Sequence, residues 1–192
     1  MSKRKSKNRR ASGNGNEAGT HQRARWLLNE GARLLRQRRP VEASDQLEQA
    51  WGLDSTLVEV AINLGGAYVM QGRHDKAVTV LEEASRREPD NVMIWINLGA
   101  AYLGHLEESD GEGQLKAIAA FEQALSLDAK APSVNYNLGL IYKERGEKER
   151  AAAHFWRALD VDPSDKDARL RLEQIGHEGN KSSGEEGEAF AA

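Results

Sequence analysis

Cysteine is absent from this sequence of 192 residues. Without thiols the chain has no disulfide framework, no thiolate metal site and no cysteine nucleophile, and a reducing compartment is the natural expectation. No apolar run reaches the length of a transmembrane helix, and the basic N-terminal segment is not followed by an apolar signal region. We therefore expect a cytoplasmic protein without a membrane span.

Motifs that carry enzyme chemistry are also missing. The sequence has no glycine-rich phosphate loop and no G-x-S-x-G turn, and its five histidines show no spacing typical of metal ligands. The acidic segment 107–113 does not match the alternating ligands of a calcium loop, so we interpret it as a solvated insertion. We predict a protein with no catalytic residue, no metal site and no cofactor.

Charge is segregated, although the net charge is only −3. Residues 1–39 contain 12 Lys or Arg against two Glu, a charge of +10, whereas the remainder contains 15 against 28, a charge of −13. Residues 1–22 have almost nothing to bury and are predicted to be a disordered basic tail, and residues 178–192 a disordered acidic tail. The basic tail can be a solvated segment that aids solubility, or it can bind nucleic acid by charge neutralisation; both interpretations stay open.

What the sequence does contain is an internal repeat. Asn-Leu-Gly followed by a tyrosine occurs at Asn63, Asn97 and Asn137. A second marker, Ala-x3-Leu/Phe-x2-Ala, begins at positions that are 34, 40 and 34 residues apart: Ala43, Ala77, Ala117 and Ala151. A 34-residue unit, with six extra residues in one copy, explains both spacings. The repeats are then 24–57, 58–91, 92–131 and 132–165.

These residues resemble the tetratricopeptide repeat (TPR), whose pattern is W-x2-L-G-x2-Y, then A-x3-F, then P. Trp95, Leu98, Gly99 and Tyr102 in the third copy supply the first part of the pattern. The first copy fits least well, because Glu30 occupies its leucine position. The resemblance implies an all-α fold, a right-handed α-solenoid of four TPR helix pairs plus a C-terminal capping helix over 166–176, within a TPR domain at 23–177.

Hydrophobic spacing by itself predicts two short helices in each unit. The expected helices cover 24–37, 41–54, 58–71, 75–87, 92–105, 114–127, 132–145 and 148–161. Gly65 and Gly139 are predicted to face Ala77 and Ala151, so that the paired helix axes approach closely. A single unit cannot bury its apolar face alone, so the units must stack.

The resemblance also implies that the first helix of each unit lines a concave groove, the usual ligand surface. We predict that this groove binds a peptide through Leu28, Asn29, Ile62, Asn63, Gly66, Met70, Ile96, Asn97, Ala100, Leu103, Tyr136 and Asn137. An asparagine amide offers one acceptor and two donors, which suits the backbone of an extended peptide. The alternative is that neighbouring helices or water already satisfy these amides, and the sequence does not decide between the two.

The predicted function is a non-catalytic protein–protein interaction adaptor or scaffold that binds a peptide or amphipathic helix. TPR domains that clamp acidic chaperone tails place lysines beside such an asparagine. The neighbours Leu28, Ile62 and Ile96 are aliphatic instead, which favours an apolar or amphipathic partner. The alternative function is a nucleic-acid- or ribosome-associated adaptor anchored by residues 1–22, and self-assembly is a third hypothesis.

Overall fold

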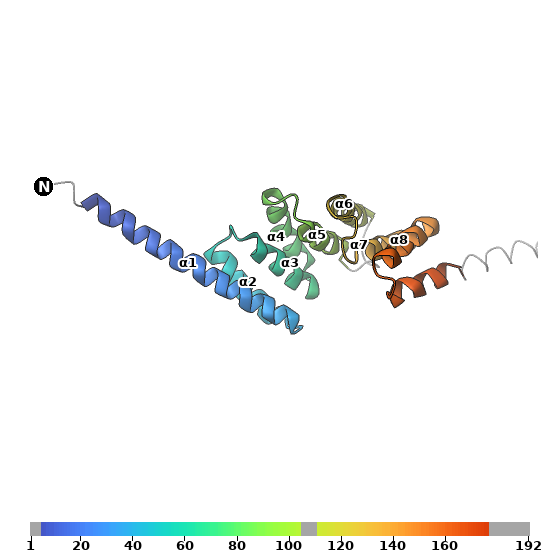
Figure 1. The fold of residues 1–192 in the computed structure, drawn as a ribbon, viewed down its shortest axis with the longest axis horizontal. Coiled ribbons are helices and arrows are strands. Elements are labelled where there is room, and N and C mark those ends of the chain that lie inside the picture. The colour runs from blue at the N-terminus through green and yellow to red at the C-terminus, as the bar shows by residue number, and fades with distance from the viewer. Residues whose placement is uncertain (1–4, 105–110, 177–192) are drawn as a thin grey trace, which may run out of the picture. The chain divides into compact units, whose positions relative to one another are not determined.

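The computed structural model describes residues 5–104 and 111–176, with side chains from residue 18 onward, and these residues form helices without a strand (Figure 1). Two compact units result, unit 1 at residues 1–104 and unit 2 at residues 105–192. The expected all-α architecture is confirmed. Residues 105–110, which contain most of the predicted insertion, and the predicted acidic tail at 178–192 lie outside the described residues.

Unit 1 contains the first two repeats and the first helix of the third. Its helices are α1 (Lys5–Arg36), α2 (Pro40–Leu53), α3 (Val58–Met70), α4 (His74–Arg87) and α5 (Val92–Leu103). Each helix packs on the next in sequence, and in addition α1 contacts α3 and α3 contacts α5. The second set of contacts brings together the first helices of successive repeats.

Unit 2 contains the remaining helices. They are α6 (Gly111–Leu127), α7 (Val134–Glu144), α8 (Lys148–Val161) and a final helix over residues 166–176. Helix α7 packs on both α6 and α8. The turns α3–α4 and α7–α8 each contain a glycine at positive φ, Gly72 at 71° and Gly146 at 75°, a conformation that side chains with a Cβ rarely adopt.

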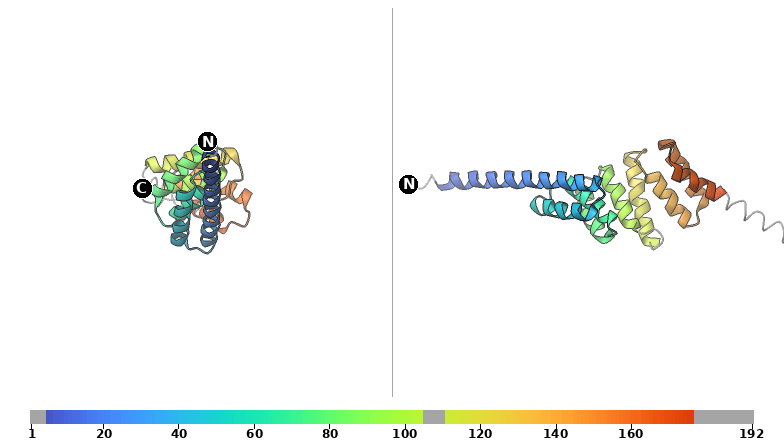
Figure 2. Two further views of the ribbon diagram at one scale, coloured as in Figure 1. Left: turned by 90° about the vertical axis from the view of Figure 1, so that its left-hand side faces the viewer. Right: turned by 90° about the horizontal axis from the view of Figure 1, so that it is seen from below.

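Helix α1 begins earlier than the sequence predicts. It runs from Lys5, so residues 5–22, predicted as part of a disordered tail, are helical in the structure, and in Figures 1 and 2 this part projects beyond α2. The second half of α1 is anchored, since Ala24, Leu27 and Leu34 are buried. Once that half is nucleated by packing, each further turn adds hydrogen bonds without a new nucleation cost. Composition alone misses this coupling between the two halves.

Close approach of the paired helices depends on glycine. A Cβ on Gly65 would lie 2.5 Å from Leu81 Cγ, and one on Gly139 would lie 2.7 Å from Phe155 Cε1. The nearest atoms therefore belong to residues one helical turn after Ala77 and Ala151, on the same helices as the neighbours that the sequence predicts. A large side chain on the second helix fills the space that the missing Cβ leaves.

A hydrogen bond that recurs with the 34-residue period joins successive repeats within unit 1. Tyr68 Oη donates to Glu48 Oε1 at 2.7 Å, and Tyr102 Oη donates to Glu82 Oε1 at 2.7 Å, one repeat later. Burial first, and the adjacent glutamate second, raise the pKa of both tyrosines to about 12. Both hydroxyls therefore stay protonated and act as donors throughout the physiological range.

The leucine position of the first repeat holds a glutamate that pairs with an arginine of its own helix. Leu64 and Leu98 are buried at the leucine position of their repeats. Glu30 holds that position in α1 and accepts a 2.9 Å hydrogen bond from Arg33 Nε at an exposed site. The ion pair within α1 thus accommodates the glutamate where the other repeats bury a leucine.

Candidate peptide-binding face

The repeat register aligns equivalent residues of α1, α3 and α5 in rows. Four rows are Leu28–Ile62–Ile96, Asn29–Asn63–Asn97, Ala32–Gly66–Ala100 and Leu35–Val69–Leu103. Residues of α3 and α5 in these rows lie close together, because Asn97 Nδ2 on α5 donates a hydrogen bond to the Ile62 carbonyl on α3 at 3.2 Å. We call this surface the α1–α3–α5 face. It lies entirely within unit 1.

Asn63 and Asn97 of the face use their amide nitrogens in hydrogen bonds to the backbone, which leaves their amide oxygens outside these bonds. Asn63 Nδ2 donates to the Glu59 carbonyl in its own helix at 2.7 Å, and Asn97 bridges two helices as described above. A carbonyl oxygen can only accept, so the amide nitrogen must face the backbone in both cases, and each Oδ1 points elsewhere. The structure thus brings one donor of each amide into internal bonds and leaves an acceptor directed away from them. Asn29 on α1 is exposed.

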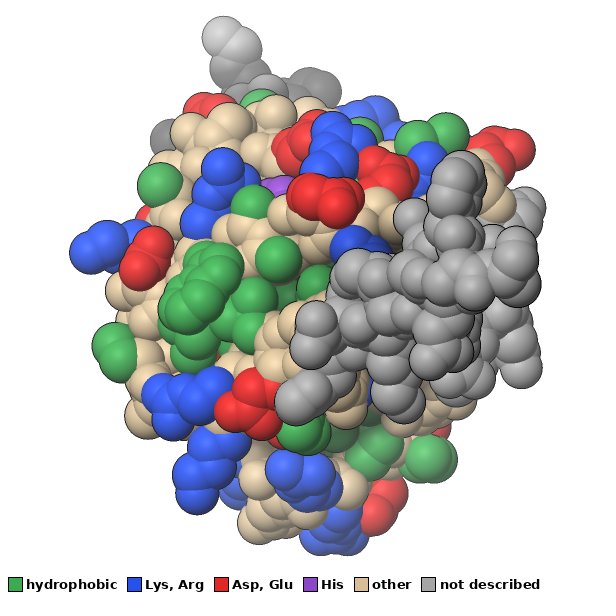
Figure 3. Space-filling view, turned by 90° about the vertical axis from the view of Figure 1, so that its right-hand side faces the viewer, with side chains coloured by type: hydrophobic (Ala, Val, Ile, Leu, Met, Phe, Trp, Pro, Cys, Tyr) green, Lys and Arg blue, Asp and Glu red, His purple; other side chains and the backbone are tan. Residues whose placement is uncertain are grey.

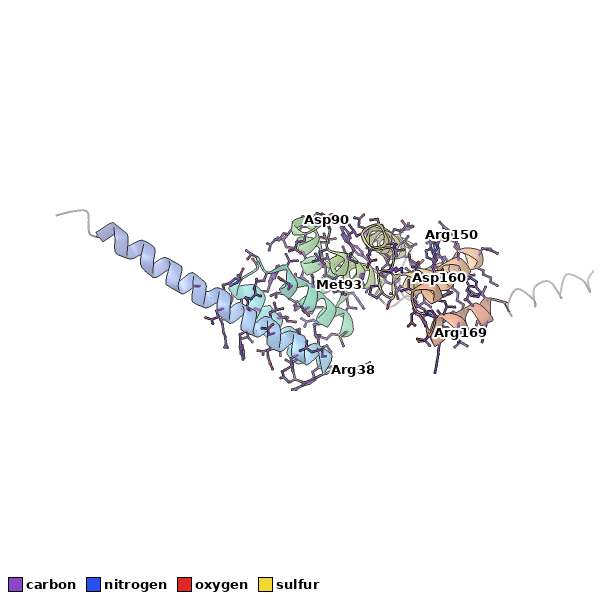
Figure 4. The ribbon with its side chains drawn as sticks, viewed as in Figure 1. Arg38, Asp90, Met93, Arg150, Asp160 and Arg169 are labelled. Atoms are coloured by element: carbon purple, nitrogen blue, oxygen red, sulfur yellow. The ribbon has the colours of Figure 1, made fainter. Side chains whose placement is uncertain are left out.

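Apolar side chains of the face reach solvent mainly through two methionines. Met70 on α3 is 52% exposed and Met93 on α5 is 46% exposed, while Ile62 and Ile96 are half-buried (Figure 4 labels Met93). Leu103, a predicted contact residue, is buried at 9% exposure and therefore packs inside the unit. Sequence reasoning missed Met93, although the register reveals it, since Met93 occupies the position of Glu59 one repeat earlier.

Two arginines of the face were also missed. Arg25 on α1 occupies the register position of Glu59 and Met93, and Arg36 occupies that of Met70. Both side chains are exposed. The residues immediately beside the asparagines are aliphatic, whereas Arg25 lies one helical turn before Asn29. Counting whole turns along α1 would have found it.

Tyr136 and Asn137, also predicted to contact a peptide, lie on α7 in unit 2. Tyr136 is half-buried and packs edge-on against Phe155, with ring centroids 5.7 Å apart. The candidate site is therefore restricted to unit 1. Exposed apolar side chains of unit 2 include Trp156. Figure 3 shows one side of the molecule, on which a patch of apolar side chains is bordered by charged ones.

Residues 5–104 and 111–176 contain no group of three or more His, Cys, Asp or Glu side chains arranged to hold a metal ion. Among these same residues, no helix has both the length and the apolar character needed to cross a bilayer.

Comparison with protein families gives three matches, all to tetratricopeptide models. Two models described as "Tetratricopeptide repeat" match residues 34–103 and 132–165, and one described as "TPR repeat" matches residues 114–146. These ranges include parts of all four repeats inferred from the sequence. A search among curated protein sequences gives no significant match.

Similar solved structures place the fold among TPR solenoids. The crystal structure of TTC0263, a thermophilic TPR protein of Thermus thermophilus, aligns with a TM-score of 0.69 at 20% identity, covering 79% of this chain and 80% of that one. MamA residues 41 to the end from Desulfovibrio magneticus aligns with a TM-score of 0.69 at 22% identity, covering 85% and 90%. A chain of the APC/C hetero-tetramer Cut9–Hcn1 aligns with a TM-score of 0.69 at 20% identity, covering 78% of this chain and 29% of its own.

Proposed function

This chain belongs to the tetratricopeptide repeat family, and from that premise we propose that it is a protein-interaction adaptor whose α1–α3–α5 face binds an amphipathic helix of a partner. The TPR fold is typical of protein–protein interaction scaffolds, and proteins of this fold are generally non-enzymatic. The proposal assigns that general role to one surface of unit 1. The observation that carries it is the pair of exposed methionines on that surface.

Methionine suits a surface that receives an apolar side chain. Its unbranched thioether adapts to irregular shapes, so exposed methionines recur at binding surfaces that accept helices. Met70 and Met93 lie on neighbouring helices, α3 and α5, beside the half-buried Ile62 and Ile96. By the repeat register Met93 lies level with Glu59, about three helical turns from Met70 along the face. A helix with a continuous apolar side, at three- and four-residue spacing, could contact both methionines along its length.

Polar groups of the same face would fix the orientation of the bound helix. The Oδ1 atoms of Asn63 and Asn97 are directed away from the backbone bonds made by their amide nitrogens. They can accept hydrogen bonds from donor side chains of the partner. Gly66 leaves space between them, since a Cβ there would have Asn97 Nδ2 as its nearest neighbour at 3.8 Å.

Fluorescence anisotropy with a labelled peptide tests the proposal. The probe is an amphipathic peptide of about 20 residues, long enough to span the unit as a helix, with Leu at three- and four-residue spacing and Gln at its polar positions. We expect Met70→Glu combined with Met93→Glu to weaken binding at least about tenfold, because two charges would then face the apolar side of the peptide. Both positions are exposed, so the free energy of unfolding should change little.

Val41→Glu is the matched control, since Val41 is an equally exposed apolar residue on α2, outside the face. This variant should bind the peptide as the parent protein does. Failure of the parent protein to bind, or equal binding by the double methionine variant, would refute the proposal.

A second candidate is a nucleic-acid- or ribosome-associated adaptor that uses the basic residues 1–39. One observation favours it: the Arg23 guanidinium lies 4.5 Å from the centroid of the Trp26 ring, and that ring is 52% exposed. An exposed aromatic beside cations is the kind of platform on which single-stranded bases stack.

A further inference from the structure

The α1 edge of the face carries two arginines without a partner in the described residues. Arg33, Arg39, Arg73, Arg86 and Arg87 of unit 1 each make an ion pair with a glutamate of the same unit. Arg23 lies over Trp26. Arg25 and Arg36, both on α1, make neither an ion pair nor a ring contact within the part of the chain that the structure describes.

The two arginines form a stripe along the face. They are 11 residues apart, which is three helical turns or about 16 Å along α1, so both side chains leave the helix on one side. Asn29 and Ala32 lie between them on that side. Arg38, the third arginine without a partner among the described residues of unit 1, belongs instead to the turn after α1, with a positive φ of 57° (Figure 4).

We infer that the partner of the α1–α3–α5 face is an acidic amphipathic helix, whose apolar side contacts Met70 and Met93 and whose carboxylates pair with Arg25 and Arg36. The inference rests on the proposed function and adds the charge of the ligand to it. Arginine suits this task because its planar guanidinium binds a carboxylate with two parallel hydrogen bonds.

The arrangement of charge also fixes how the helix would lie. Arg25 and Arg36 are both on α1, whereas α3 contributes Glu59 to the same face and α5 contributes apolar residues. A helix aligned with α1, with its carboxylates toward α1 and its apolar residues toward α3 and α5, satisfies every one of these groups except Glu59. Two acidic residues that are also 11 positions apart match the spacing of the arginines.

Nucleic acid would also be attracted to Arg25 and Arg36, but it fits the rest of the face less well. A phosphate backbone gains from a continuous run of cations. Here the row that begins at Arg25 continues with Glu59 and Met93, and the row that begins at Arg36 continues with Met70. A carboxylate and exposed thioethers beside the arginines favour a ligand that is acidic on one edge only and apolar on the other.

A charge-exchange experiment tests the inference. Three peptides share the leucine pattern described above and differ at two edge positions 11 residues apart, which carry Glu, Gln or Lys. We expect the parent protein to bind the Glu peptide about tenfold more tightly than the Gln peptide, with a difference that shrinks as salt rises. The Arg25→Glu/Arg36→Glu variant should reverse the order and prefer the Lys peptide.

Arg23→Glu is the control, because it also reverses the charge of an arginine on α1, but on the side occupied by Trp26. It should keep the preference for the Glu peptide. Circular dichroism should show the same helix content in all variants, since the three arginines are exposed.

The remaining outcomes separate the two proposals. Equal binding of the Glu, Gln and Lys peptides would overturn the acidic ligand and leave the binding face intact. Binding of none of the three would overturn the binding face itself. Binding of an oligouridylate, lost on Arg25→Glu/Arg36→Glu, together with failure of the Glu peptide, would overturn the inference in favour of nucleic acid.

Discussion

At the scale of single residues, the fourth repeat contains a polar contact where a typical TPR has a tryptophan. Asn135 occupies that position on α7 and is only 4% exposed. A buried amide is costly unless it is hydrogen-bonded, and the ring of His154 on α8 provides the bond, with Nδ1 3.1 Å from Asn135 Oδ1. His154 also stacks on Tyr142, with ring centroids 5.3 Å apart. In place of the usual tryptophan, the fourth repeat therefore uses a cluster of three side chains, Asn135 and Tyr142 from α7 and His154 from α8.

The same contact predicts a dependence of stability on pH. Burial first, and then the nearby Arg157 and Arg150, lower the pKa of His154 to about 4. The unfolded chain, with an ordinary histidine pKa of about 6.5, binds this proton more readily, so the stability contributed by neutral His154 is complete above that pH. It is lost as the pH falls from about 6.5 toward 4. Since the ring is partly solvated, we expect a loss in Tm of roughly 2–4 °C from this group.

His154→Phe is the informative variant, because phenylalanine keeps an aromatic ring beside Tyr142 but has no proton to bind. Thermal denaturation between about pH 7 and pH 4 should give a shallower decline of Tm for the variant than for the parent protein. The variant should also be less stable at neutral pH, since Asn135 loses its hydrogen bond. Parallel declines in the two proteins would show that His154 does not cause the pH dependence.

At the scale of helices, pairing depends on how closely two axes approach. Gly65 on α3 leaves room for Leu81 on α4, and Leu81 is completely buried. The neighbouring Gly66 lies on the α1–α3–α5 face, where a Cβ would meet nothing closer than Asn97 Nδ2 at 3.8 Å. Two adjacent glycines in one helix thus have different roles, one in packing and one on a surface. The α3–α4 pair is held by the first of them.

We predict opposite effects for alanine at the two glycines. Gly65→Ala places a Cβ 2.5 Å from Leu81 Cγ, so overpacking should lower the free energy of unfolding by about 1–3 kcal/mol despite the better helix propensity of alanine. Gly66→Ala meets only Asn97 Nδ2 at 3.8 Å and should be neutral or slightly stabilising. Urea denaturation measures both variants. Equal stability of the two variants would contradict the packing argument.

At the scale of the whole molecule, charge is separated along the sequence. Residues 1–39 carry +10 and the remainder −13. Pairing within unit 1 offsets part of the positive charge: Arg33 pairs with Glu30 and Arg39 with Glu42, which lowers the pKa of both glutamates, in each case through the hydrogen bond from the arginine first. The six cations of residues 1–22 can attract a polyanion without using the α1–α3–α5 face.

We predict that this charge separation produces weak, salt-sensitive binding of nucleic acid that is independent of peptide binding. The full chain should bind a labelled oligouridylate at low salt, with affinity falling at least about tenfold between 50 and 200 mM salt as counterions compete. Deleting residues 1–22 removes 6 of the 12 cations in residues 1–39 and should weaken this binding strongly. Peptide affinity should not change. If the deletion leaves oligouridylate binding unchanged, residues 1–22 do not bind the nucleic acid.

How much the sequence predicts depends on whether a feature is local. The helix boundaries within 40–103 and 134–161 follow from apolar spacing and turn residues, and they agree with the structure to within two residues. The start of α1 does not follow, because residues 5–22 have no apolar pattern of their own and are helical as a continuation of an anchored segment. The nearest neighbours of Gly65 and Gly139, which are Leu81 and Phe155, do not follow either, since the relative slide of two paired helices is not encoded in either helix alone.

The sequence by itself determined the family, the number of repeats and the slots from which a binding face is built, because a periodic pattern fixes which residues are equivalent. Only the tertiary structure decided what each slot does. It shows that Asn97 bridges to α3, that Leu103 is enclosed, that Met93 is exposed, and that Arg25 and Arg36 are without partners among the described residues. The physical reason is that exposure and pairing depend on neighbours brought from other helices, whereas periodicity depends only on the order of the chain.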